Sequence, residues 1–249
     1  MNEKAPPEYI ANRYRLQEQL GKGGMGSVYR AHDEMLDRDI AIKFLLPRQN
    51  PIGASSERFL REARAVARLS HPNIMLLFDM GQQDDWYYLV LEHIPGTNLH
   101  RMIEEQAGPL SLIEALRIIR ETLKALGYAH AQGCIHRDIK PENIMVTLEN
   151  EVKIADFGLA LAKGDVRLTA DDSVLGTALY MAPETTMGED VDHRADLYAV
   201  GAVFYEMLTG QPPFDGDTAM QIMAHALHTP LTPPRMVNPS IPENTAPTA

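Results

Sequence analysis

Short runs of apolar residues in the first ninety positions predict a small β-sheet. Runs rich in Val, Ile, Tyr and Leu cover residues 14–20, 27–33 and 38–45, and short runs of this kind are typical of strands. Glycines join the first two runs, which indicates an antiparallel hairpin. Two further strands are predicted at 74–80 and 86–93.

A helical spacing interrupts the strands at residues 57–69. Phe59, Ala63, Val66 and Ala67 recur there on one face, while the arginines of the segment lie largely elsewhere. This is the period of an amphipathic helix.

Longer helical patterns follow in the second half of the chain. Ser111 and Glu114 form a capping box, which predicts an apolar-striped helix over 111–132. Two more helices are predicted at 195–208 and 218–227. The second half is therefore expected to be mainly helical.

These patterns predict an α+β fold with two lobes. The sheet would form an N-terminal lobe over 14–93 and the helices a C-terminal lobe over 97–228, with a cleft where the lobes join. Residues 1–13 are interpreted as an N-terminal extension. Residues 229–249 hold six prolines without a helix or strand period, so they are predicted to form an extended tail.

Composition excludes several functional classes. The net charge of −11 argues against a nucleic-acid partner, because phosphate backbones are bound by basic surfaces. No apolar run approaches the ~20 residues of a membrane span, and the first twenty residues lack the apolar core of a secretory signal. A cytoplasmic protein is the expectation. The single cysteine, Cys134, excludes an intramolecular disulfide framework.

A glycine-rich turn joins the first two predicted strands. It has the spacing G-x-G-x-x-G-x-V, formed by Gly21, Lys22, Gly23, Gly24, Met25, Gly26, Ser27 and Val28. In dinucleotide folds a helix follows such glycines, whereas a β-branched and aromatic run follows here. Glycines in a hairpin let main-chain N–H groups approach phosphates closely. Taken alone, the segment also fits an ordinary glycine-rich hairpin.

A lysine occupies an apolar setting on the third predicted strand. Lys43 stands between Ile42 and Phe44, and a lysine that faces inward must find a partner or lose its charge. Glu62, on the following predicted helix, is the expected partner.

Polar groups suited to phosphate chemistry gather between residues 136 and 158. This segment opens with His136-Arg137-Asp138 and closes with Asp156-Phe157-Gly158, and between them stand Lys140 and Asn143. Carboxylate and amide oxygens are the hard ligands that Mg²⁺ prefers.

These motifs follow one another in an order that resembles the signature of eukaryotic-like protein kinases, with Ala182-Pro183-Glu184 as its last part. The segments 21–33 and 136–143 are similar to those of the bacterial Ser/Thr kinases. The resemblance covers about residues 14–227. It implies an enzyme that uses ATP and Mg²⁺ to phosphorylate Ser/Thr hydroxyls of protein substrates.

The resemblance implies roles for the residues of the loop. Asp138 would orient the substrate hydroxyl and take its proton, and Lys140 would steady the γ-phosphate as in Ser/Thr kinases. Asn143 and Asp156 would hold the metal ions. Thr177 looks like the substrate-loop threonine that contacts the catalytic Asp and Lys.

The resemblance also implies a nucleotide site between the lobes. The Lys43–Glu62 pair would hold the α- and β-phosphates. The adenine would lie against Leu20, Val28, Ala41 and Met145 and along the main chain of Glu92 and Ile94, with Leu91 as gatekeeper. His136 would be structural and not a base, packed in a spine with Val66, Leu77 and Phe157.

Regulation by phosphorylation is implied in the same way. Arg137 beside the catalytic residue could dock a phosphorylated loop, and Thr169 and Ser173 are the candidate phosphosites. Asp171 and Asp172 could partly substitute for a phosphate.

Two other functions fit parts of the sequence. A pseudokinase scaffold would bind nucleotide or partners without catalysis, but the complete set of polar residues argues against it. A small-molecule kinase of related fold is the second alternative. Lys140, Thr177 and the 182–184 segment argue for a peptide-docking loop instead.

The region after Glu184 departs from the family pattern. In the family this glutamate pairs with an arginine between the last two large helices, whereas only Arg194 and Arg235 follow here, at other positions. A buried carboxylate without a partner costs about 3–5 kcal/mol. The expectation is a kinase domain that is incomplete at its C-terminal end, marginally stable and exposing an apolar patch.

Overall fold

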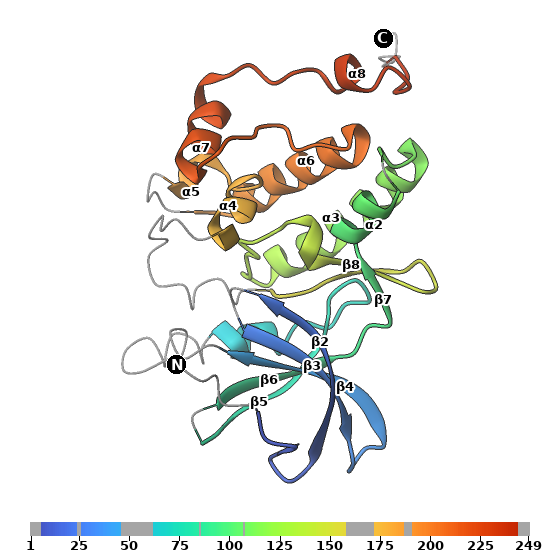
Figure 1. The fold of residues 1–249 in the computed structure, drawn as a ribbon, viewed down its shortest axis with the longest axis vertical. Coiled ribbons are helices and arrows are strands. Elements are labelled where there is room, and N and C mark those ends of the chain that lie inside the picture. Colours follow the sequence, from blue (N-terminus) through green and yellow to red (C-terminus); the bar gives the residue numbers. More distant parts are fainter. Residues whose placement is uncertain are drawn as a thin grey trace.

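The N-terminal lobe is built on a six-stranded antiparallel sheet (Figure 1). The computed structural model describes residues 6–23, 26–45, 62–84, 86–106, 108–157, 172–186 and 191–243. The sheet has the order β1-β2-β3-β4-β6-β5, with bounds β1 Tyr9–Ile10, β2 Tyr14–Gly23, β3 Gly26–Asp33, β4 Arg38–Leu45, β5 Leu77–Gln83 and β6 Trp86–Glu92. It begins with β1, inside the segment interpreted as an N-terminal extension.

The two faces of this sheet bury different side chains. Along β4, Ile40 and Phe44 belong to a cluster within the N-terminal lobe, whereas Ala41 and Leu45 belong to the main core that continues into the second lobe. Side chains alternate along a strand, so Lys43 lies on the Ala41 face, where it is only 5% exposed. The prediction of an inward-facing lysine is confirmed.

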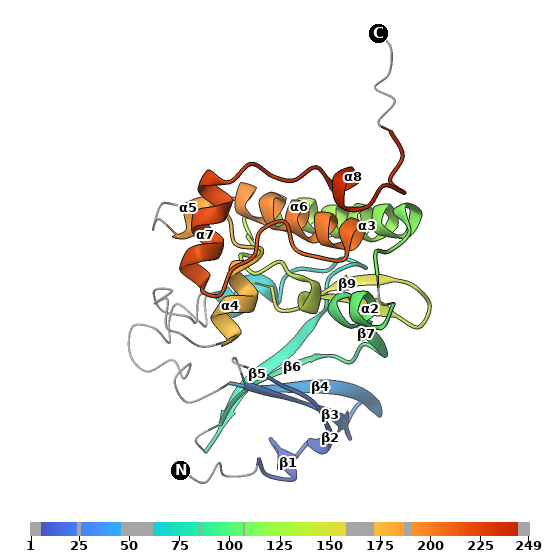
Figure 2. The same ribbon diagram turned by 45° about the horizontal axis from the view of Figure 1, so that its top comes forward.

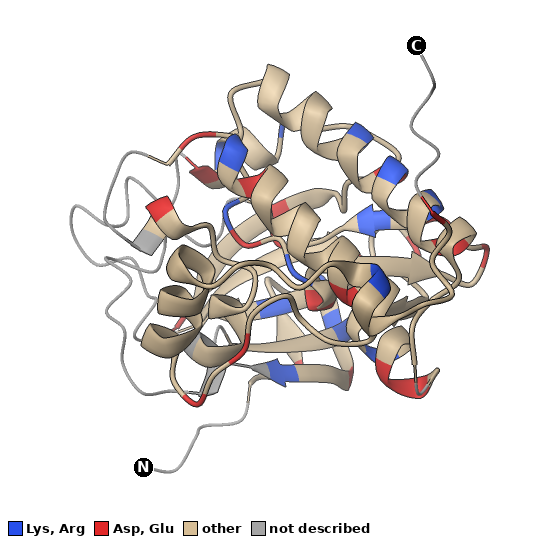
Figure 3. Ribbon diagram, turned by 90° about the horizontal axis from the view of Figure 1, so that it is seen from above, with Lys and Arg blue, Asp and Glu red and all other residues tan. Residues whose placement is uncertain are grey.

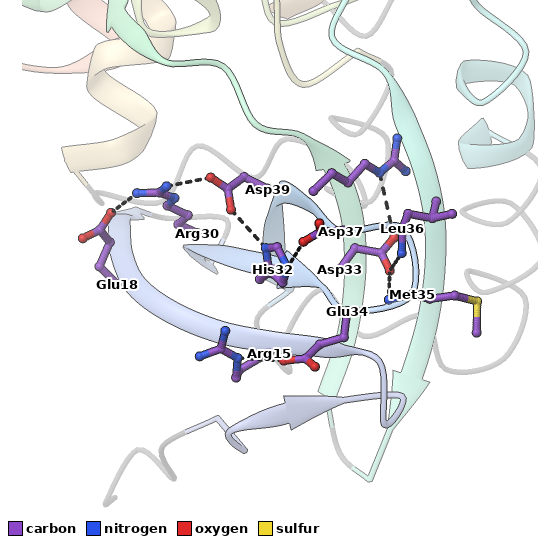
Figure 4. A network of polar contacts seen from close by, with 11 residues as sticks. Arg15, Glu18, Arg30, His32, Asp33, Glu34, Met35, Leu36, Asp37 and Asp39 are labelled. Carbon is purple, nitrogen blue, oxygen red and sulfur yellow. Dashed lines mark hydrogen bonds and ion pairs between the residues drawn. The ribbon is translucent and has the colours of Figure 1, made fainter.

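Ion pairs connect β2, β3 and β4 on the surface of the lobe (Figure 4). Arg30 bridges Glu18 and Asp39 at nitrogen–oxygen distances of 3.2 and 2.6 Å. His32 lies 3.2 Å from Asp37 and 3.4 Å from Asp39. Exposed ion pairs are screened by solvent, so the buried apolar faces hold the sheet and this network adds little.

Two predicted elements end or begin elsewhere than expected. The helix predicted over 57–69 is helical at residues 62–66, and its first five residues lie outside the described ones. β5 starts at Leu77 instead of residue 74. The reason is that Ile74 forms a parallel bridge with Ile154, while the Met75 N–H donates to the Ile154 carbonyl at 2.9 Å. The first residues of the predicted strand thus pair with Ile154 of the second lobe and not with β6.

A small sheet lies between the larger sheet and the main helices (Figure 2). Its order is β7-β8-β9, with bounds β7 Gly96–Asn98, β8 Ile144–Thr147 and β9 Val152–Ile154, and α2 Leu99–Glu105 follows β7. The sequence pattern predicts none of these elements, because strands of three or four residues and a helix of seven are too short to show a period.

The C-terminal lobe is helical, as predicted. Its three long helices correspond to the predicted ones and are α3 Leu112–Ala131, α6 Arg194–Thr209 and α7 Ala219–His228. The Ser111 hydroxyl accepts the Glu114 N–H at 3.2 Å, which confirms the predicted cap of α3. Gly210 ends α6 with a φ of 78°, a left-handed conformation that glycine adopts without a Cβ clash.

Between β9 and α6, the described residues form two short helices. They are α4 Asp172–Ala178 and α5 Pro183–Thr186. Ala178 packs against Ile222 and Met223 of α7, so the last part of α4 is anchored to the floor of the lobe.

The proline-rich tail is not purely extended, contrary to the prediction. It contains a one-turn helix, α8 Pro234–Val237, and the Asn238 amide donates to the Leu208 carbonyl at 2.7 Å. Ile241 packs against the main core. These contacts, which no sequence period encodes, hold the tail along α6.

The carboxylate of Glu184 destabilises the fold less than the sequence suggests. Glu184 forms no hydrogen bond or ion pair within the described residues, yet its side chain is only partly buried. Water can therefore solvate the carboxylate, and the cost of a fully buried charge does not apply. Apolar side chains are exposed on the same lobe, among them Ile113, Leu116 and Leu197.

The charged residues are dispersed over both lobes. In the view from above, segments with Lys or Arg lie among segments with Asp or Glu instead of gathering on one face (Figure 3). Among the described residues, no helix has the length and apolar content needed to span a membrane. The two-lobed α+β architecture predicted from the pattern is confirmed.

A buried carboxyl of the C-terminal lobe gives stability a pH dependence. Glu206 of α6 is 8% exposed and accepts the Tyr180 hydroxyl at 2.5 Å. Burial raises its pKa above the ordinary 4.5, and Glu142 adds to the shift, while the Tyr180 hydrogen bond and His100 oppose it. The folded state therefore holds this proton more tightly than the unfolded state. The stability from this group is present below pH 4.5 and is lost as pH rises through the folded-state pKa.

We predict that Glu206→Gln stabilises the domain at neutral pH relative to acid pH. Glutamine keeps an oxygen for the Tyr180 hydroxyl but cannot ionise, so the variant avoids the cost of a buried charge. In thermal melts over a pH series, the Tm of the variant minus that of the wild type should increase from about pH 4.5 to pH 8. Glu149→Gln, at an exposed position, is the matched control. A Tm difference that does not change with pH would contradict this prediction.

Candidate active site

The loop of residues 135–140 between α3 and β8 is held by a carboxylate of α6. Asp196 is 1% exposed, and its Oδ2 accepts the His136 N–H at 2.9 Å while its Oδ1 accepts the Arg137 N–H at 2.7 Å. His130 of α3 contacts Oδ2 through Nε2 at 2.7 Å. A single buried side chain thus joins two helices to the loop.

These bonds stabilise an unusual backbone conformation. Arg137 has a φ of 68°, a region that costs a residue with a side chain of order 1–3 kcal/mol. A hydrogen bond to a charged group contributes about 1.5–3 kcal/mol. The two main-chain bonds to Asp196 are therefore sufficient to offset the strain.

His136 uses both of its ring nitrogens inside the protein. Nδ1 accepts the Asp138 N–H at 3.2 Å, and Nε2 lies 2.8 Å from the Ala155 carbonyl, to which it must donate. The ring packs edge-on against Phe157 with centroids 4.6 Å apart. This burial and bonding leave no ring nitrogen for proton transfer, in agreement with the predicted structural role. The predicted spine partners Val66 and Leu77 are buried in the same core.

Asp138 and Asn143 are fixed relative to each other. The Asn143 amide donates to the Asp138 carbonyl at 2.7 Å, so the side-chain oxygen of Asn143 is the atom that remains for a cation. Asp138 is 6% exposed, and its Oδ1 has no hydrogen-bond partner among the described residues. An unpartnered buried oxygen is costly, and it is suited to accept a proton from a bound hydroxyl.

Lys140 links the loop to the predicted substrate threonine. Its ammonium donates to the Thr177 hydroxyl at 3.2 Å and lies 3.8 Å from Asp138 Oδ2. The predicted contact between Thr177 and this lysine is confirmed. It anchors α4 beside Asp138.

An ion pair between the lobes joins Lys43 to Asp156. The Lys43 ammonium donates to Asp156 Oδ2 at 2.6 Å. Burial acts to raise the pKa of Asp156, but the Lys43 charge and hydrogen bond outweigh it, so the pKa lies below its ordinary value. Asp156 is therefore ionised at neutral pH and can act as a metal ligand. Its φ of 62° is a second strained position in the site.

The remaining phosphate-binding candidates are only partly described. β2 and β3 form the predicted hairpin, in which Gly23 lies opposite Gly26, whereas Gly24 and Met25 lie outside the described residues. Gly26 has a φ of 135°, and a Cβ there would overlap the Phe44 carbonyl, so this position requires glycine. The Lys43–Glu62 pairing stays a prediction.

The predicted adenine residues line the junction of the lobes. Ala41 and Leu91 are opposite one another in the sheet, and Val28 packs against the same core, whereas Leu20 is 47% exposed. Ile94 is buried, and its main-chain N–H forms no hydrogen bond within the described part of the chain. A free donor at this point is what a planar base with ring nitrogens needs.

The side chains of the two candidate phosphosites lie outside the described part of the structure. Thr169 lies outside the described residues, and Ser173 lies in α4 where only the backbone is described.

Sequence reasoning missed Asp196 and His130. Asp196 holds the loop through its main-chain N–H groups, and His130 contacts Asp196. The available signal is an aspartate at a buried position in the first turn of an apolar helix, which needs partners.

Comparisons with known proteins agree with this geometry. The model of the family described as "Protein kinase domain" matches residues 14–247. The chain is 39% identical over 235 residues to the serine/threonine-protein kinase PrkC of Bacillus subtilis, covering 94% of this chain and 36% of the relative. It is 40% identical over 236 residues to PknB of Mycolicibacterium smegmatis, covering 92% and 38%. The chain thus spans little more than a third of the length of these relatives.

A solved structure shows the same fold. The PknI kinase domain of Mycobacterium tuberculosis superposes with a TM-score of 0.74 at 27% identity, covering 95% of this chain and 85% of that structure. With a family model that matches most of its length, a two-lobed fold and the loop around Asp138 in place, the chain belongs to the protein kinase domain family.

Proposed function

We propose that this domain transfers the γ-phosphate of ATP to Ser/Thr hydroxyls of protein substrates. The observation that carries the proposal is the buried Asp138 carboxylate, whose Oδ1 has no partner among the described residues, beside a lysine that also binds Thr177. A proton acceptor next to a cation fits transfer of a phosphoryl group to a hydroxyl.

Each polar residue has a proposed role. Asp138 orients the acceptor hydroxyl and takes its proton, and Lys140 neutralises charge on the transferred group. Asn143 and Asp156 would hold Mg²⁺, which supplies positive charge at the phosphates when bound. Lys43, with Glu62 as its predicted partner, would contact the α- and β-phosphates. The family uses ATP, and the hard oxygens at these two positions fit Mg²⁺.

The choice of Ser/Thr substrates rests on two supports. Lys140 occurs in the Ser/Thr form of the loop, and its hydrogen bond with Thr177 ties it to the segment expected to receive peptide. The relatives PrkC and PknB carry the name serine/threonine-protein kinase. We propose that the domain works in the cytoplasm, where ATP is supplied. A catalytically weak nucleotide-binding scaffold is the alternative that an activity assay must exclude.

Asp138→Asn should abolish most phosphotransfer and nearly spare ATP binding. The substitution removes the proton acceptor, and general-base catalysis contributes about 10²–10⁴-fold, so kcat for a peptide substrate should fall by that order. Asp37→Asn, at a 97% exposed side chain, is the matched control. Turnover near the wild-type value in the Asp138 variant would remove Asp138 from this role.

Asp156→Ala should instead weaken the binding of ATP in the presence of Mg²⁺. An interaction with a charged group is worth about 1.5–3 kcal/mol. Its loss should lower the affinity roughly tenfold or more. Calorimetric titrations measure the affinity for ATP with Mg²⁺ and with a chelator that removes it. The variant should bind ATP more weakly than the wild type only when Mg²⁺ is present. Equal affinities of variant and wild type with Mg²⁺ would count against Asp156 as a metal ligand.

Autophosphorylation at Thr169 or Ser173 is proposed to raise activity through Arg137. Asp196 binds the Arg137 main chain and not its side chain, and a guanidinium is suited to bind a phosphate by charge-assisted hydrogen bonds. Replacing both sites by alanine should lower peptide phosphorylation relative to the enzyme preincubated with ATP. If the two rates are equal, the loop is already held without phosphate, with Asp171 and Asp172 as the alternative contacts.

A further inference from the structure

A partly buried ion pair joins the two lobes at the place where the chain passes between them. Lys153 of β9 and Glu92, the last residue of β6, approach with Nζ and Oε1 2.8 Å apart. Their side chains are 14% and 23% exposed, whereas the surface pair Arg15–Glu34 is 45% and 46% exposed. Because the pair is shielded from water, it is screened less than a surface pair.

The carboxylate of Glu92 is fixed through both of its oxygens. Oε2 accepts the Leu76 N–H at 3.2 Å, while Oε1 binds Lys153. The Glu92 main-chain N–H also donates to the Leu76 carbonyl at 2.9 Å. Glu92 is therefore held from the N-terminal lobe by the segment before β5 and from the C-terminal lobe by Lys153.

The same stretch of β9 bonds to that segment through its main chain. Ile154 donates to the Asn73 carbonyl and accepts the Met75 N–H, each at 2.9 Å. The Asn73 side chain donates to the Val152 carbonyl at 2.7 Å. Lys153 thus lies in a set of contacts that fixes β9 against the N-terminal lobe just before Asp156.

Lys153 also stands next to the expected floor of the adenine site. It pairs with Met145 across β8 and β9, and residues opposite each other in a ladder point to the same face. The side chain of Lys153 therefore lies on the Met145 face, and its charge ends at the residue whose main chain would contact the base.

We propose that Lys153 is a positioning residue for nucleotide binding. By holding the Glu92 carboxylate, it fixes the main chain of residues 92–94 relative to Met145. The main-chain donors and acceptors that would bind adenine are then in place before ATP binds. The inference rests on the proposed use of ATP. Sequence reasoning assigned only the main chain of Glu92 and gave Lys153 no role.

The test replaces Lys153 by Met, which keeps the length of the side chain and removes its charge. We expect the Kd and KM for ATP to rise about 3- to 10-fold, with kcat changed less than about twofold, because a coupled pair of this kind acts on affinity and not on the chemical step. Lys153→Arg should restore the wild-type Kd, since it can still bind Glu92. Lys124→Met removes an exposed lysine paired with Glu121 and is the matched control.

A double-mutant cycle shows whether Lys153 acts through Glu92. Glu92→Gln keeps an acceptor for the Leu76 N–H but loses the charge. The double variant Glu92→Gln with Lys153→Met should bind ATP no more weakly than the weaker single variant. Additive losses would mean that Lys153 does not act through Glu92 and would overturn the proposal.

The outcomes separate this inference from the proposed function. If the wild type binds no ATP in a calorimetric titration, the proposed function fails. If it binds ATP and Lys153→Met has the same Kd, or loses kcat and Tm with an unchanged Kd, then the positioning role is wrong while the kinase activity stands. Should Lys153→Met fail to fold, the Kd of Glu92→Gln decides, and an unchanged value rejects the proposal.

Discussion

The geometry of the candidate active site depends on one buried carboxylate, that of Asp196. Asp196 accepts two main-chain N–H groups of the loop and contacts His130, which places the strained Arg137 backbone between two rigid helices. Each charge-assisted bond is worth about 1.5–3 kcal/mol, and the strain is of similar size. The loop therefore keeps its conformation only while this carboxylate is in place.

From Asp196, hydrogen bonds extend to the residues proposed to bind the metal. His136 donates to the Ala155 carbonyl, and the Ala155 N–H donates to the Asn143 carbonyl at 2.8 Å. The next residue, Asp156, binds Lys43 of the sheet. The proposed proton acceptor, the two proposed metal ligands and the lysine proposed to bind phosphate thus belong to one connected set, so a shift of the loop moves the carboxylates together with it.

Sequence reasoning succeeded where a period or a motif is local. The helix over 111–132 and its cap follow from Ser111 and Glu114, and the inward-facing Lys43 was expected from its apolar neighbours on the strand. The loop residues were found because their spacing resembles a family signature. The limits of β5 and the contacts of the tail were not found, because partners distant in sequence, Ile154 for β5 and Leu208 for the tail, decide them.

The residues that the sequence did not predict were missed for one physical reason. Asp196, His130 and Lys153 each contact a partner at least 59 residues away in sequence. A single sequence shows the residue type but not the partner, so a buried charge on a helix or strand can be recognised only as a group that needs one. Tertiary structure adds most to a motif at such groups. The motif supplies the functional atoms, and the buried charged residues hold those atoms in position relative to one another. In this domain Asp196 holds the loop that carries Asp138, the proposed proton acceptor, and Lys153 holds the carboxylate of Glu92 in the same way.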